Sequence, residues 1–128
     1  MRRQYVRIVA AALAMMAGIT AFAAYPDKPV RVIVPFPAGG PVDTVTRVVA
    51  ERISSELKQT VVVENRAGAA GQIGSEAAAN STADGYTLLM GSSSTHSLPT
   101  LLGQKLAYNP VSSVAPVGVV GLSPTQYL

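Results

Sequence analysis

The sequence contains no cysteine and only one histidine, and the apolar segment IVAAALAMMAGITAF near its N-terminus, residues 8–22, is fifteen residues with no charge. Without cysteine there is no disulfide framework, and no lipid can be attached to a cysteine after the apolar run. Fifteen residues are fewer than the roughly 20 that a membrane-spanning helix needs, which argues against an anchor.

The first 23 residues have the three-part pattern of a secretory signal peptide. The segment MRRQYVR carries three arginines and no acidic residue, and the apolar run follows it. Ala21-Phe22-Ala23 then places small residues where a signal peptidase reads the chain. The pattern predicts that residues 1–23 are removed on export and that residues 24–128 form the folded part in the periplasm.

The charges of the exported part are balanced. Three of the ten basic residues lie in the signal, which leaves seven basic residues against all seven acidic ones. A net charge near zero provides no electrostatic footprint for nucleic acid or for an anionic membrane surface. No nucleic-acid partner is therefore expected.

Strand-like and helix-like segments alternate along the exported part. Four β-branched or apolar runs predict strands: residues 30–36, 60–64, 86–90 and 115–122. Segments with helical character follow the first three: residues 43–58, 72–80 and 98–102. Asp43 is placed to act as the N-cap of the first of these helices. The alternation predicts an α/β domain with a mainly parallel sheet and flanking helices.

In such a sheet the loops that follow the strands meet at one edge, where ligands bind. The first of three such loops, residues 35–43, contains Gly39 and Gly40, which let a ligand approach the backbone at a helix N-terminus and favour an anion. No Lys-Ser or Lys-Thr pair follows these glycines, so the loop is not a P-loop. A tight strand-to-helix turn explains the same glycines equally well, and both explanations stay open.

The second loop, residues 65–72, has glycines spaced G-x-x-G-x-x-G from Gly68 to Gly74, which is not the dinucleotide pattern. These glycines favour a loop with close helix packing, and no cofactor is expected. Arg66, the only charge in this loop, is expected to pair with Glu64 or to be solvated.

The third loop, residues 91–97, is rich in hydroxyl groups that can orient a small molecule without adding net charge. His96 is the only histidine, and no partner at a recognisable spacing completes a metal site. A triad of Ser94, His96 and Asp43 lacks the G-x-S-x-G elbow, and neighbours two residues apart rarely align as nucleophile and base. We therefore expect no metal, no catalytic residue and no enzymatic activity.

Four segments together resemble, in order and spacing, the Bug-type periplasmic solute-binding receptors of tripartite tricarboxylate transporters. The resemblance covers essentially all of the exported part and agrees with the export signal. The segments are YPDKPVRVIVPFPAGGPVDTVTRVVAERI, VVVENRAGAAGQIGSEAAA, ADGYTLLMGSSSTH and LAYNPVSSVAPVGVV.

The resemblance implies a type II periplasmic-binding-protein fold, in which two α/β domains close around a small carboxylate or amino-acid-like ligand. Family members are much longer, so residues 24–128 are expected to be an incomplete N-terminal domain. The second domain and a returning strand between the third and fourth strands would be absent, and binding would be weak. The exposed strand edges would also allow a strand-exchanged dimer.

The resemblance also implies where the ligand binds. In this family the loops that correspond to residues 36–43 and 92–97 approach the ligand's carboxylate through backbone N–H and hydroxyl groups, and membrane transporter subunits are the partners. Asp43 would meet an ammonium group if the ligand were an amino acid. Pro99 and Gly103 depart from the asparagine and tyrosine that the family usually has there. The expected ligand-binding residues are Phe36, Pro37, Ala38, Gly39, Gly40, Asp43, Ser92, Ser93, Ser94, Thr95 and His96.

Three classes of function stay open. The first is a receptor that binds a solute without turnover. The second is an exported domain that binds no ligand and acts only by association. The third, a small hydrolytic enzyme, would require a nucleophile and base that the sequence does not show.

The signal peptide leads to a direct prediction. When the chain is expressed in a Gram-negative bacterium, mass spectrometry of the exported product is expected to show Ala24 as the first residue. The variant Ala23→Tyr puts a bulky side chain where the peptidase requires a small one and is expected to stay uncleaved. Recovery of the wild-type chain with residues 1–23 still attached would contradict the assignment.

Overall fold

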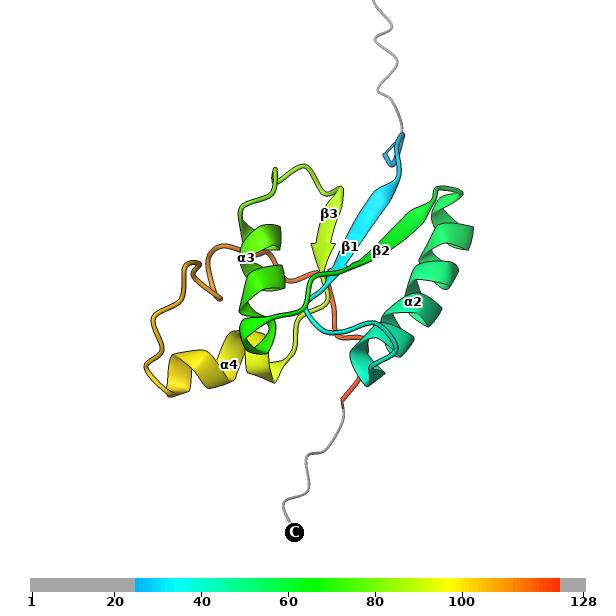
Figure 1. Cartoon of the computed structure of the whole chain (residues 1–128). Helices are drawn as coiled ribbons and strands as arrows, with labels where there is room; N and C mark the ends of the chain where they lie inside the picture. The colour runs from blue at the N-terminus through cyan, green and yellow to red at the C-terminus, as the bar shows by residue number, and fades with distance from the viewer. Residues whose placement is uncertain (1–24, 123–128) are drawn as a thin grey trace, which may run out of the picture.

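The computed structural model describes residues 25–122, which form a three-stranded sheet with helices on both faces (Figure 1). The predicted signal peptide lies outside the described residues. The elements in chain order are β1 (Val30–Val34), α2 (Pro41–Leu57), β2 (Val61–Asn65), the 3-10 helix η2 (Ala69–Gly71), α3 (Gln72–Ala79), β3 (Thr87–Leu89) and α4 (Ser93–Leu101).

All three strands run in the same direction, in the order β2-β1-β3. In the register of the central strand, Val30 lies opposite Val61 and Arg31 lies opposite Thr87. The continuous β-branched run of β1 suits a strand that is buried on both faces, and Ile33 and Val34 are fully buried. The predicted α/β class and parallel sheet are confirmed.

The helices form one layer on each face of the sheet. Helix α2 packs on β1 and β2, whereas α3 packs on β1 and β3 on the opposite side (Figure 1). Helix α3 lies very close to the chain that leaves β1, because a Cβ added at Gly74 would lie 2.7 Å from the Arg66 carbonyl oxygen and 2.8 Å from Pro35 Cα. The expectation that these glycines permit close helix packing is confirmed at Gly74.

The first helix begins two residues earlier than predicted. Gly40 is the N-cap and Pro41 is the first helical residue, so Asp43 occupies the third helical position and the N-cap assignment was wrong. Proline suits the first position because its ring presets the helical φ angle and its missing N–H would have no partner there.

The helix predicted at residues 98–102 is longer and begins at Ser93, inside the segment expected to be a loop. Ser92 is its N-cap. The Ser92 N–H donates to Thr95 Oγ1 at 2.9 Å, which is one half of a capping box between these residues. The hydroxyl-rich segment is therefore the start of a helix.

The strand predicted at residues 115–122 does not form, and this segment has no regular secondary structure. Pro116 lacks an N–H, and the two glycines of the segment further weaken a strand. Val117 and Leu122 are 87% and 92% exposed, so the apolar residues that suggested a buried strand are not covered by the described part of the chain.

Proline inside α4 is accommodated by a distant tyrosine. Pro99 has no N–H to donate to the carbonyl of Thr95, four residues before it. The Tyr108 hydroxyl donates to that carbonyl instead, at 2.6 Å, and Tyr108 is only 8% exposed. This bond ties the chain that follows α4 to the first turn of the helix.

Removing this hydroxyl should destabilise the fold. In Tyr108→Phe the buried Thr95 carbonyl loses its partner, so the free energy of unfolding is expected to fall by about 1–3 kcal/mol. Tyr25→Phe is the matched control, because the Tyr25 hydroxyl also donates to a carbonyl, that of Gly85 at 2.7 Å, from an exposed position. Denaturant titration showing equal losses for the two variants would contradict this role of Tyr108.

Candidate functional site

The three loops that follow the strands meet at Gly71. This residue has a φ angle of 93°, and a Cβ added to it would lie 2.7 Å from Thr95 Cγ2 and 3.4 Å from Phe36 Cζ. Phe36 belongs to the first loop, Gly71 ends the 3-10 helix η2 within the second, and Thr95 lies in the first turn of α4, in the segment predicted as the third loop. The expectation that the first and third loops lie side by side is confirmed, and Gly71 is a contact residue that the sequence patterns did not reveal.

Helices α2, α3 and α4 all begin at this edge of the sheet, since each follows a loop at the carboxyl end of a parallel strand (Figure 1). Their N-termini carry partial positive charge and backbone N–H groups without helical partners. In α2 these groups belong to Val42 and Asp43, because Pro41 has none. The edge is therefore rich in hydrogen-bond donors and suits an anion.

The first loop is held by the carboxylate of Asp43, a residue of the helix that follows it. The Gly39 N–H donates to Asp43 Oδ2 at 2.8 Å, and the Gly40 N–H donates to the Pro37 carbonyl at 3.3 Å. Gly39 has a φ angle of 80°, which glycine adopts without strain. The glycines thus shape the turn, and the N–H groups left for a ligand lie just beyond them in α2.

Asp43 is buried at 3% exposure and receives donors on both carboxylate oxygens. Arg47 Nε donates to Oδ2 at 3.0 Å and Asn65 Nδ2 donates to Oδ1 at 2.8 Å, in addition to the Gly39 N–H. The hydrogen bond from Arg47, then those from Gly39 and Asn65, lower the pKa of Asp43 to about 2. Its acceptor positions are used within the protein, although the sequence predicted it as a ligand contact.

The residues predicted in the third loop divide into two groups. Ser93 is exposed and Ser94 is half-buried, so both can meet a ligand at the start of α4. Thr95 is fully buried and its hydroxyl accepts the Ser92 N–H, which is a structural role. The half-buried His96 ring packs on Gly91, where an added Cβ would lie 2.6 Å from His96 Cε1.

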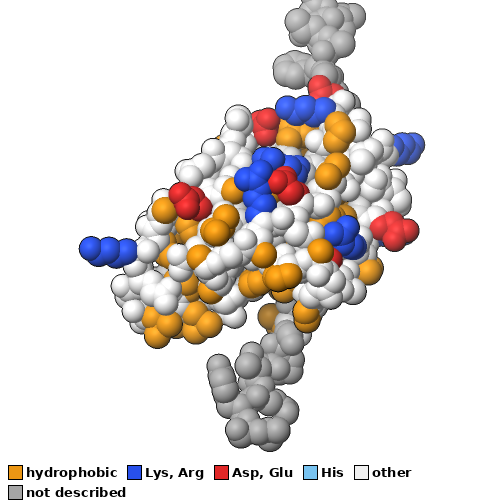
Figure 2. All heavy atoms as spheres, in the orientation of Figure 1, with side chains coloured by type: hydrophobic (Ala, Val, Ile, Leu, Met, Phe, Trp, Pro, Cys, Tyr) orange, Lys and Arg blue, Asp and Glu red, His pale blue; other side chains and the backbone are white. Residues whose placement is uncertain are grey.

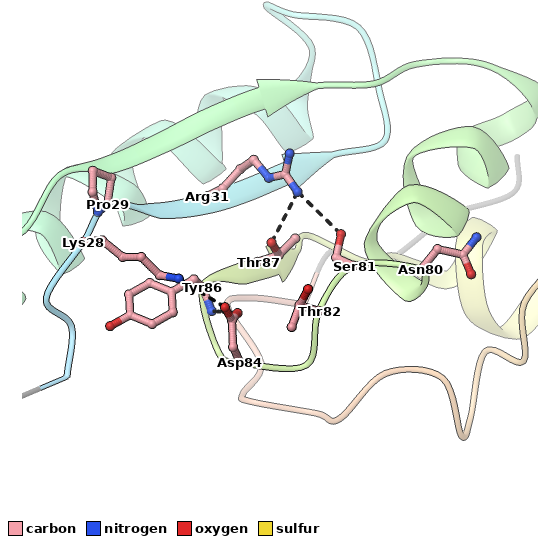
Figure 3. Close-up of a pocket in the computed structure, with 9 residues that line it drawn as sticks. All are labelled: Lys28, Pro29, Arg31, Asn80, Ser81, Thr82, Asp84, Tyr86 and Thr87. Carbon is pink, nitrogen blue, oxygen red and sulfur yellow. Dashed lines mark hydrogen bonds and ion pairs between the residues drawn. The ribbon is translucent and has the colours of Figure 1, made fainter.

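An open depression of about 450 Å³ lies at the opposite end of the sheet, near the start of β1 and β3 (Figure 3). Arg31 points toward Ser81 and Thr87 there, and Lys28 lies over the Tyr86 ring. Both cations are already paired, Arg31 with Glu64 and Lys28 with Asp84, each at 3.3 Å. The depression contains none of the predicted ligand-binding residues, and each of its two cations already contacts an acidic side chain.

Several charged side chains elsewhere on the described surface are also paired, among them Arg52 with Glu56 and Arg47 with Asp43. Figure 2 shows basic side chains next to acidic ones in the middle of this face, and hydrophobic side chains gathered over the α4 end. The predicted pair between Arg66 and Glu64 is confirmed. Among residues 25–122, no cluster of three His, Asp or Glu side chains could hold a metal ion, and no helix is long and apolar enough to cross a membrane.

The lowered pKa of Asp43 leads to a prediction about pH. Because the folded pKa of about 2 lies below the ordinary value of 3.8, ionised Asp43 stabilises the fold above pH 3.8, and this contribution is lost as the pH falls toward 2. The difference in unfolding free energy between the wild type and Asp43→Asn should stay constant from neutral pH to about pH 5 and then shrink. A difference that does not change between pH 5 and pH 2 would contradict the network.

Three comparisons place this geometry among known proteins. The protein BugT of Bordetella pertussis is 48% identical over 101 residues, which are 76% of this chain and 30% of that protein. A solved structure described as a periplasmic transporter is 46% identical, with a TM-score of 0.64 over 69% of this chain. The structure of MatC from Rhodopseudomonas palustris, with bound malate, is 37% identical, with a TM-score of 0.63 over 70% of this chain.

The chain spans about 30% of the length of each of these proteins. The structural matches confirm that its sheet and flanking helices correspond to part of a periplasmic-binding-protein fold. The sequence profile of one family, described as the tripartite tricarboxylate transporter family receptor, matches residues 45–128, more than half of the chain. The chain belongs to this family of solute receptors, as the resemblance of its motifs predicted.

Proposed function

We propose that this chain forms one wall of the binding site of an exported receptor, which captures a small di- or tricarboxylate in the periplasm for a membrane transporter. The observation that carries this proposal is that the segments following the three strands come together at Gly71, at the edge where α2 and α4 begin. One carboxylate group of the ligand would lie against the N-termini of α2 and α4.

The donors at this edge suit a carboxylate. The N–H groups of Val42 and Asp43 and the hydroxyls of Ser93 and Ser94 are neutral, and each can donate to a carboxylate oxygen. Hydrogen bonds to a charged acceptor contribute about 1.5–3 kcal/mol each, so a few of them suffice to hold one carboxylate group. The malate in MatC, a dicarboxylate, supports this ligand class for a related protein.

The side-chain partners favour binding over hydrolysis. Ser94 Oγ lies 2.9 Å from Ser92 Oγ, and His96 Nδ1 lies 2.8 Å from Thr95 Oγ1. Neither contact joins a serine nucleophile to a histidine base, which a hydrolytic site would require. A periplasmic location and a transporter partner are in line with the family to which the chain belongs.

The proposal predicts a localised response to ligand. Titration of the chain with malate, followed by amide NMR, is expected to shift the Val42, Asp43, Ser93 and Ser94 signals and to saturate in the millimolar range, equivalent to about 4 kcal/mol. The neutral diamide malamide should cause no comparable shifts, because it lacks the charged acceptors.

Two serine variants sharpen the test. Ser94→Ala is expected to weaken malate binding about tenfold, because it removes a donor to a charged group. Ser55→Ala, at an exposed position on α2, should leave binding unchanged. Equal responses to malate and malamide, or shifts confined to the depression around Arg31, would contradict the proposed site.

A further inference from the structure

Asn65 lies at the end of β2 and connects that strand to the first loop. Its Nδ2 donates to the Phe36 carbonyl at 3.1 Å and to Asp43 Oδ1 at 2.8 Å. Its Oδ1 accepts a bond from Arg47 Nη2 at 3.0 Å. Both amide hydrogens and the amide oxygen are thus used, and all three partners belong to the loop or to α2 behind it.

The bonds of Asn65 and Asp43 form a closed network around the first loop. The loop is held at Phe36 by Asn65 and at Gly39 by Asp43. Arg47 bonds to both side chains, through Nε to Asp43 and through Nη2 to Asn65. Five hydrogen bonds make up the network, and the backbone between Phe36 and Gly39 is therefore fixed at both ends.

The position of Asn65 depends on the sheet. Asn65 lies opposite Val34 in the parallel pair of β1 and β2, and the next residue, Arg66, donates its N–H to the Val34 carbonyl at 2.8 Å. The backbone that carries the Asn65 amide is therefore held by the central strand itself. A side chain on such a rigid element can position a loop more accurately than another loop residue can.

The network also affects the charge that a ligand would meet. Asp43 is the acidic residue among those predicted to contact ligand, and its carboxylate faces Arg47, Asn65 and the Gly39 N–H. With donors on both oxygens and 3% exposure, the carboxylate is not presented to a ligand as a partner for an ammonium group.

We infer that Asn65 is a positioning residue of the ligand site, which acts with Asp43 to hold the Phe36–Gly40 loop and leaves this wall selective for carboxylate rather than ammonium groups. The ligand selectivity in this inference rests on the proposed function. The positioning of the loop rests only on the hydrogen-bond network. The inference makes the Asp43 carboxylate a support of the site, so that only the backbone N–H of Asp43, and not its side chain, is left for the ligand.

The first experiment measures the loop without ligand. In Asn65→Ala, hydrogen exchange at the Gly39 amide is expected to accelerate about tenfold, because Asp43 and the Phe36 carbonyl both lose a partner. Exchange at the amides of β1 should stay unchanged, which separates loop release from general loss of stability. Asn80→Ala removes an exposed asparagine at the end of α3 and should alter neither. Unchanged Gly39 exchange in Asn65→Ala would overturn the positioning role.

The second experiment compares two probes, L-malate and L-aspartate, which differ by a hydroxyl and an ammonium group. Asn65→Ala and Asp43→Asn are each expected to weaken the binding of both probes by the same factor, because the loop that serves the carboxylate is released. A selective loss of aspartate binding in Asp43→Asn would overturn the inference, because it would show that Asp43 contacts the ammonium group. Undiminished binding of both probes in Asn65→Ala would overturn it as well.

The two experiments separate this inference from the proposed function. If the wild-type chain bound neither probe, the proposed function would fail, and no selectivity could be assigned to the site. The exchange of Gly39 would still decide whether Asn65 and Asp43 hold the loop, since that measurement requires no ligand.

Discussion

Strand β1 is paired with a parallel neighbour on each side and covered by a helix on each face, and every other feature depends on this arrangement. Because the three strands run in one direction, each loop that follows a strand emerges at the same edge. The helices that begin there direct their N-termini to that edge. If one strand were antiparallel, its loop would lie at the opposite end and the donors would be divided between two sites.

The parallel sheet brings the loops together, but two glycines determine how closely they approach. At Gly71 the backbone fits between Phe36 and Thr95, and at Gly74 helix α3 lies against Pro35. A methyl group at either position would come within 2.8 Å of a neighbouring atom. The glycine spacing that excludes a dinucleotide site therefore has a positive explanation, because it allows one helix and two loops to share a small volume.

Local patterns in the sequence predicted the β-branched strands, the first two helices and the edge where the loops meet. The predicted start of α2 was wrong because Pro41, which suits the first helical position, lies before Asp43 and begins the helix. The spacing of Ser92 and Thr95 fits a capping pair, but the serine-rich composition of the segment favours a loop, and the helix start was therefore not predicted. The hydrogen-bond partners of Tyr108 and Asn65 lie 13 to 29 residues away in the sequence. Hydrophobic periodicity within one helix or strand does not indicate such contacts.

The charged groups around the proposed site are paired at short range, Asp43 with Arg47 and Glu64 with both Arg66 and Arg31. What remains at the edge are the dipoles of helix ends and hydroxyl groups, whose field declines more steeply with distance than that of a net charge. Such a surface does not steer an anion from afar, so the association rate would be set by diffusion and fit. The association rate would also depend little on the ionic strength of the surrounding medium, because there is no long-range attraction for dissolved salt to screen.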